Sequence, residues 1–84
     1  MMSADDSSKV NSKEELLAFL DVVLRDHAKN GTDWANQDIP SYIDALQSWL
    51  EASDGYYENR NEDAAKISPW RRMADAMAAA RIYE

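Results

Sequence analysis

The sequence IPSYIDALQSWL at residues 39–50 decides the structure of the middle of the chain. Its large apolar side chains recur at i, i+3, i+4, i+7, i+10 and i+11, which is the pattern of one helix face (Ile39, Tyr42, Ile43, Leu46, Trp49 and Leu50). Asp38 precedes the stretch as an N-cap, and Pro40 stands in the first turn, where its missing N–H costs nothing. The stretch predicts a helix over residues 39–52, ended by the breaker Ser53-Asp54-Gly55.

A second helix is predicted upstream, over residues 12–29. Ser12 and Glu15 form a capping box, in which each side chain accepts a hydrogen bond from the backbone N–H of the other residue. Apolar residues follow at helical spacing (Leu16, Leu17, Phe19, Leu20, Val23 and Leu24). Asn30-Gly31 is a typical stop, and His27 before it is expected to be a cation favoured at the end of the helix.

A third helix is predicted over residues 69–82. Ser68 supplies the cap and Pro69 the first helical position. The helix is rich in alanine, which has high helix propensity and little bulk (Ala74, Ala76, Ala78, Ala79 and Ala80). Trp70, Met73 and Met77 share one face, and we expect the two methionines in the core, with an adaptable groove as the alternative.

The remaining segments contain no periodic pattern. Residues 53–67 are polar and acidic, so we expect a long loop there, with at most one short helical turn. Residues 1–11 are small, polar and charged, which indicates a disordered tail apart from Val10. The predicted fold class is therefore all-α: a small three-helix domain over residues 12–84, preceded by a disordered tail.

Charge and composition restrict the classes of partner. The chain has 84 residues, a net charge of −7 and no cysteine. This charge argues against nucleic acid and against anionic membrane surfaces, because such ligands need basic patches. The beginning of the chain lacks the basic start and apolar stretch of a signal peptide, and no apolar run is long enough to cross a membrane. We therefore expect a cytoplasmic protein.

No grouping of residues has a catalytic or metal-binding pattern. His27 is the sole histidine, and it has no cysteine or second histidine to join it as a ligand or base. The carboxylates are spread along the chain, and the stretch from Asp54 to Asp63 lacks the pattern of a calcium loop. We therefore expect no enzyme activity, no metal and no cofactor.

Aromatic and acidic residues outside the helices are the candidate partner-binding residues: Trp34, Tyr56, Tyr57, Glu58, Glu62 and Asp63. Trp34 either plugs one end of the core or is an exposed anchor, since Trp is enriched at interface hot spots. Asn36 beside it is expected to bind the loop backbone. Of the adjacent tyrosines, we expect one to point inward and the other outward.

Arg71 and Arg72 stand in the first turn of the third helix, which is an unfavourable position for cations. One explanation is an acidic neighbour from residues 58–63. The other is an anion bound by both arginines and the helix N-terminus, which makes them the candidate anion-binding residues.

Several motifs resemble a family of small uncharacterised bacterial proteins, a domain of unknown function. They are the Trp34-x-Asn36 motif, the run Tyr42-Ile43-x-Ala45-Leu46-x-x-Trp49-Leu50, and the ending Ala80-Arg81-x-Tyr83-Glu84. Matching residues also occur at Ser12-x-x-Glu15-Leu16-x-x-Phe19-Leu20 and Trp70-x-x-Met73-Ala74. The resemblance implies a small bacterial domain and no known activity.

The sequence favours a non-enzymatic protein-binding module. Its acidity fits a basic protein partner, as in immunity proteins that neutralise toxins. The alternative is a structural homo-oligomer, in the simplest case a homodimer, that packs through the alanine-rich helix. An enzyme is the third and least favoured class.

Overall fold

The computed structural model describes residues 2–83, and its regular structure is entirely helical. Three α-helices run from Lys13 to Asn30 (α1), Ile39 to Asn59 (α2) and Pro69 to Ala80 (α3). Short 3₁₀ helices precede or join them at Ser7–Lys9 (η1), Gly31–Asp33 (η2) and Ala64–Lys66 (η3). No strand occurs among the described residues, so the predicted all-α, three-helix fold is confirmed.

Each predicted N-cap is present. Ser12 Oγ accepts a hydrogen bond from the N–H of Glu15 at 3.1 Å, and Asp38 Oδ1 accepts one from the N–H of Ser41 at 2.9 Å. Ser68 caps α3 in the same way, through the N–H of Arg71. These contacts satisfy N–H groups that have no partner within the helix, so local sequence determines where all three helices begin. The capping box is altered, because the Glu15 carboxylate accepts from the N–H of Asn11 instead of Ser12.

The predicted end of α2 at residue 52 is wrong. The helix continues through Ser53-Asp54-Gly55 to Asn59, so residues 53–59 of the predicted loop are helical. Trp49, Ser53 and Tyr57 recur every four residues and are all buried, whereas a Cβ at Gly55 would meet nothing within 4 Å. Burial of this face therefore outweighs the weak helix propensity of Ser53, Asp54 and Gly55.

α2 stops at Asn59, and the chain turns just beyond it at Asn61, whose φ of 61° lies in the left-handed region. Asn tolerates this conformation better than most residues, and it lets the N–H of Glu62 reach the carbonyl of Tyr57 at 2.9 Å. The chain then forms the single short turn η3 before α3, which matches the one turn expected in this segment. At the other end, α3 stops at Ala80, two residues before its predicted end.

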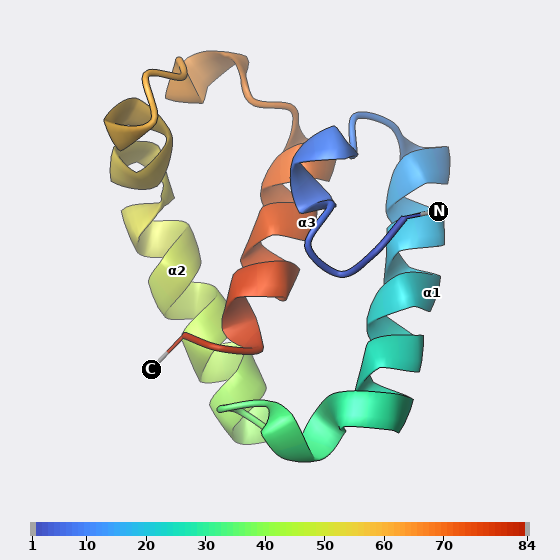
Figure 1. Ribbon diagram of the computed structural model, residues 1–84. Coiled ribbons are helices and arrows are strands. Elements are labelled where there is room, and N and C mark those ends of the chain that lie inside the picture. The colour runs from blue at the N-terminus through green and yellow to red at the C-terminus, as the bar shows by residue number, and fades with distance from the viewer. Residues whose placement is uncertain (1, 84) are drawn as a thin grey trace.

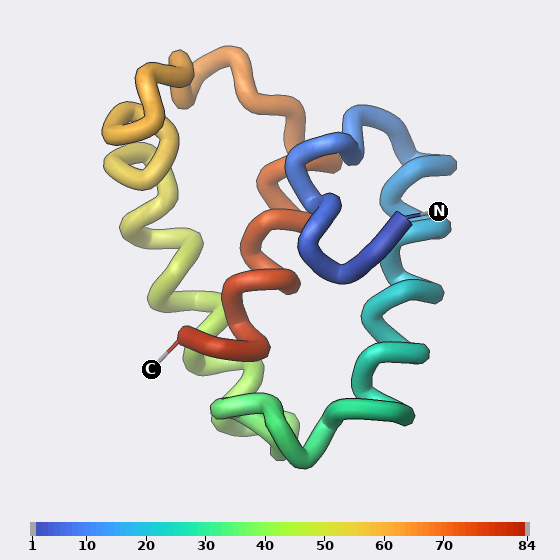
Figure 2. The backbone as a smooth tube through the Cα atoms, viewed as in Figure 1, coloured from blue at the N-terminus to red at the C-terminus, as the bar shows by residue number. Residues whose placement is uncertain are grey.

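The predicted N-terminal tail packs against the domain in the structure. Ala4 and Val10 are buried, and η1 contacts α3. Figure 2 shows this segment folding back across the domain beside α3. Long-range burial of a few apolar residues therefore orders a segment whose composition indicated disorder. Met1, also part of the predicted tail, lies outside the described residues.

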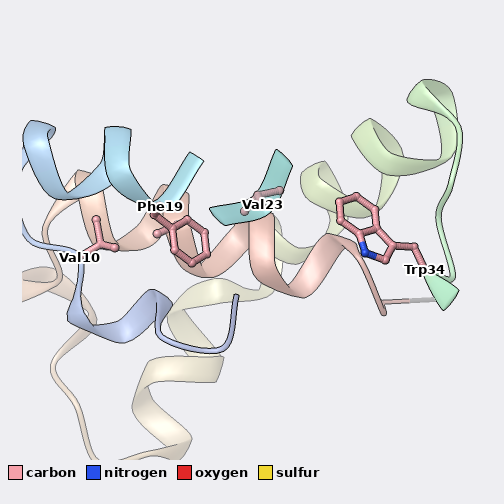
Figure 3. Packing of buried hydrophobic residues seen from close by; sticks show 5 residues of the cluster. Val10, Phe19, Val23 and Trp34 are labelled. Carbon is pink, nitrogen blue, oxygen red and sulfur yellow. The ribbon is translucent and has the colours of Figure 1, made fainter. Parts of the chain in front are cut away.

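α3 lies between α1 and α2 and contacts both (Figure 1). On the α1 side of α3 the core comprises Val10, Phe19, Val23, Trp34 and Ala74, four of which are labelled in Figure 3. On its α2 side the core comprises Trp49, Tyr57, Ala64 and Ala76. The alanines of α3 therefore let two helices approach it from opposite sides.

This arrangement bears on the predicted homo-oligomer. Ala74, Ala76 and Ala80 have no exposed surface, since the chain's own elements already cover them. These three alanines are therefore covered within one chain, whereas Ala78 and Ala79 are half-buried.

Candidate functional site

The structure divides the sequence-predicted site residues among a largely buried polar cluster, the hydrophobic core and the surface. Tyr57, Glu62, Arg71 and Arg72 come together with Asp75, where the end of α2 meets the beginning of α3. We call these five residues the Asp75 cluster. Trp34 lies in the core next to α1, away from this cluster, while Tyr56, Glu58 and Asp63 are exposed.

Asp75 is the centre of the cluster and was missed in the sequence. Its carboxylate, 6% exposed, accepts hydrogen bonds from the Ser7 hydroxyl at 2.6 Å, the Tyr57 hydroxyl at 2.7 Å and Arg71 Nε at 3.2 Å. These three donors come from the N-terminal segment, α2 and α3. A buried carboxylate is stable only with such partners, so Asp75 fixes three elements relative to one another. The available signal was its position four residues after Arg71 on one helix face.

Both arginines are held by acceptors of the chain itself. Arg71 forms a two-pronged pair with Glu62, through Nη1 at 2.8 Å and Nη2 at 3.0 Å. Arg72 donates to Asp54 at 2.8 Å and to the carbonyl of Ala64 at 2.8 Å. The predicted acidic neighbour is therefore confirmed for Arg71. An external anion at this place would have to displace Glu62 or Asp54.

Tyr57 is fully buried between the two arginines. Their guanidinium carbons lie 5.3 Å (Arg71) and 5.1 Å (Arg72) from the centre of its ring. Burial, together with the hydrogen bond to Asp75, raises the pKa of the Tyr57 phenol. Hydrogen bonds from Arg71 lower the pKa of Glu62, so this carboxylate is ionised at neutral pH. The cluster is thus a closed structural unit, and Tyr57 is not available to a partner.

Trp34 plugs the core, as one of the two interpretations predicted. Its ring stacks on Tyr42 at a centroid distance of 5.6 Å and meets the His27 ring edge-on at 5.0 Å. Its indole N–H donates to Asp26 at 2.8 Å. That bond is the main cause of the lowered pKa of Asp26, with further bonds from Asn30 and Arg81.

Asn36 does not bind its own loop. Its amide donates to the carbonyl of Ala80 at 2.9 Å and to the carbonyl of Tyr83, so it ties the end of α3 to the connection between α1 and α2. The same end of the chain is held by Arg81, whose Nη1 lies 3.2 Å from Asp26. Sequence spacing gave no signal for either contact, because the partners are more than 40 residues apart.

A hollow of about 250 Å³ lies where α1, α2 and α3 converge near the α1–α2 connection. It is lined by Val23, Leu24, His27, Trp34, Asn36, Gln37, Asp38, Ile39, Tyr42 and Met77. Two of its lining residues are largely exposed, Leu24 at 69% and Ile39 at 74%. We call this feature the α1–α2 hollow.

Further exposed apolar side chains continue from this hollow along the same helices. Ile43 is one turn beyond Ile39, Met73 is one turn from Met77, and Leu17 is two turns from Leu24. Each of these three is between 40% and 55% exposed. Together with Leu24 and Ile39 they form what we call the apolar face. Met73, expected in the core, instead belongs to this face, which favours the adaptable-groove interpretation.

A second, wider hollow of about 550 Å³ involves the N-terminal segment, α2 and α3. Tyr56 lies on it, 38% exposed, together with Trp49, Tyr83, Arg81 and Ile82. The adjacent tyrosines therefore divide as expected, with Tyr57 inward and Tyr56 outward. Asp75 and Arg81 also line this hollow, but both already have partners. Asp75 accepts hydrogen bonds from Ser7 and from its own cluster, and Arg81 donates one to Asp26.

Within residues 2–83, no three His, Cys, Asp or Glu side chains gather in a way that would hold a metal ion. None of the helices in this part of the chain has the length and apolarity needed to cross a membrane.

Comparison with known proteins gives one result. No curated protein and no solved structure matches the chain. A family described as a family of unknown function, DUF7660, matches residues 12–84. These residues include all three α-helices, and therefore the helical residues that line both hollows. The chain therefore belongs to the DUF7660 family of unknown function.

Proposed function

We propose that this protein is a non-enzymatic protein-binding module that binds its partner through the apolar face. One observation carries the proposal: five large apolar side chains of this face are 40% to 74% exposed in a chain of only 84 residues. Large exposed apolar patches on small soluble proteins mark interaction sites, because leaving them in water is unfavourable. Each such side chain that a partner buries fully contributes about 1.5–3 kcal/mol before ordering costs.

The sequence-based expectation of a basic partner belongs to the proposal. The net charge of −7 favours association with a positively charged protein and repels another copy of the chain. A neutralising role, like that of an immunity protein, fits this charge. Bacterial origin and a cytoplasmic location are also proposed, on the resemblance of the motifs and the absence of cysteine.

The experiment compares two surface substitutions of the same type. In Ile39→Ser/Ile43→Ser the apolar face is interrupted, whereas Ile82→Ser removes an equally exposed side chain, 69% exposed, from the second hollow. The wild type and both variants are used as bait at low salt in lysate of the source cells, after circular dichroism has shown that they are folded.

We expect wild type and Ile82→Ser to retain one protein in stoichiometric amount, and the double variant to lose it. Retention of the same proteins by all three baits, or of none by any, would overturn the proposal. Light scattering of the wild type and of the double variant serves as a parallel measurement. A wild-type dimer that becomes a monomer in the double variant would assign the apolar face to self-association.

A further inference from the structure

We infer that the apolar face holds a cationic amphipathic helix of the partner, laid along α3 between α1 and α2. This inference rests on the proposed function and adds the chemistry of the partner. It is argued from the shape of the face, the size of the α1–α2 hollow and the charges beside them.

The dimensions of the face fit two to three turns of a helix. The exposed residues Leu17 and Leu24 are seven residues apart on α1, which is about 10 Å along its axis. Met73 and Met77 cover about 6 Å of α3 between the two flanking helices. A partner helix would bring side chains at i, i+3 or i+4, and i+7 over this length, which is the usual pattern of helix-in-groove recognition.

The α1–α2 hollow fits a single large side chain. Its volume of about 250 Å³ lies below the roughly 300–1,000 Å³ of pockets that enclose drug-sized ligands. Its walls are mainly apolar, from Leu24, Ile39 and Met77. One aromatic or aliphatic anchor of the partner would enter there, and the flexible methionines would adapt to its shape.

The charges beside the face are mainly acidic. Asp21 stands between Leu17 and Leu24 on α1, four residues after one and three before the other. Asp38 lines the hollow, and the N–H of Ser41 lowers the pKa of its carboxyl, which keeps it ionised. Lys13, one turn before Leu17, is an exposed cation at the far end of the face.

This charge pattern selects the occupant. A helix with lysine or arginine beside its apolar stripe would place cations opposite Asp21 and Asp38. A second copy would face these acids with its own, since a two-fold interface brings the same patch of both chains together. An acidic helix would be repelled in the same way.

The test uses two synthetic peptides of about four helical turns with identical Leu and Trp positions at i, i+4, i+7 and i+11. One peptide has Lys at the positions beside the apolar stripe, and the other has Glu. Each is titrated into the isotope-labelled full chain while amide and methyl resonances are recorded by NMR. We expect the Lys peptide to shift the resonances of Leu24, Ile39, Ile43 and Met77, and to bind at least about tenfold more tightly than the Glu peptide.

Two further measurements test the electrostatic part. Sodium chloride at about 0.5 M, where the Debye length is about 4 Å, should weaken the Lys peptide several-fold. Asp21→Asn should weaken it about two- to fivefold, as expected for one exposed ion pair. Asp5→Asn is the control, because that carboxylate is exposed beside the second hollow.

Equal affinity of the two peptides, or shifts confined to the second hollow, would overturn the inference. So would the absence of binding by the Lys peptide. The peptide experiment can fail while the lysate experiment still shows a partner that depends on Ile39 and Ile43. In that case the proposed binding module stands, and only the inference of a cationic helix is refuted. If both experiments fail, both proposals fall.

Discussion

Replacing Asp75 with Asn is the most direct test of how this fold is held together. The substitution preserves the shape of the side chain and removes its charge. The carboxylate is buried and accepts three hydrogen bonds, from Ser7, Tyr57 and Arg71. In the variant, the amide oxygen still accepts from Tyr57 and Arg71, while the amide nitrogen turns toward the Ser7 hydroxyl, which rotates to accept.

The expected loss follows from the difference between charged and neutral hydrogen bonds. A bond to a charged group contributes about 1.5–3 kcal/mol and a neutral one about 0.5–1.5 kcal/mol, so the bonds from Ser7 and Tyr57, which become neutral, lose about 2–3 kcal/mol together. The charged Arg71 still donates to the amide oxygen, but it loses the attraction of the carboxylate. The neutral amide is less costly to bury, which offsets part of this loss. We therefore expect the free energy of unfolding to fall by about 2–3 kcal/mol. A domain of this length has about 4–13 kcal/mol in total.

Urea unfolding followed by circular dichroism at pH 7 measures this change. A thermal scan should show a Tm lower by about 10–20 °C, from about 4–8 °C per kcal/mol for a domain of this size. Asp44→Asn, on an exposed position of α2, is the matched control. A loss below about 1 kcal/mol for Asp75→Asn would show that the Asp75 cluster contributes no more than an ordinary hydrogen bond, and would refute the reasoning.

Three other changes test separate parts of the structure. Phe19→Ala should lower the free energy of unfolding by about 3–5 kcal/mol, because the ring is fully buried; a smaller loss in urea unfolding would mean that the core closes around the cavity. Asn36→Ala should cost about 1–2 kcal/mol and speed hydrogen exchange at the end of α3, and unchanged exchange would contradict the tie that its amide provides. The hydrogen bond from Trp34 lowers the pKa of Asp26, so the ionised carboxylate stabilises the fold above its unfolded pKa of about 4. This contribution is lost as the pH falls through the lowered pKa. In Asp26→Asn the free energy of unfolding should therefore decrease less steeply with falling pH. An unchanged acid slope in that variant would contradict the assignment.

The beginnings of the helices were predictable because their causes are local. Ser12, Asp38 and Ser68 each bond to an N–H three residues ahead, and this contact forms in any context that allows the helix. The order of apolar residues at helical spacing likewise predicted three amphipathic helices. The split between Tyr56 and Tyr57 was predicted from their adjacency alone, because both were expected in a loop. They lie on α2, where neighbouring residues point about 100° apart.

The candidate site was less predictable. Periodicity suggested that Leu17, Leu24 and Ile43 face the core, but the structure leaves them exposed. A stripe of apolar residues shows which side of a helix faces inward. How much of the width of that stripe is buried depends on the side chains of the neighbouring helix. α3 fills the space between α1 and α2 largely with small side chains such as Ala74 and Ala76, and these do not reach the outer edge of either stripe.

Taken by itself, the sequence determined that this chain is helical, where each helix begins and that it carries excess negative charge. Those features depend on contacts within one or two helical turns and on composition. Only the tertiary structure decided that α2 passes through Gly55, that Val10 and Ser7 join the fold, and that Asp75 is its polar centre. Each of these depends on partners far away in the chain, such as the 68 residues that separate Ser7 from Asp75, and burial by a distant segment outweighed the local preference for a turn or for disorder.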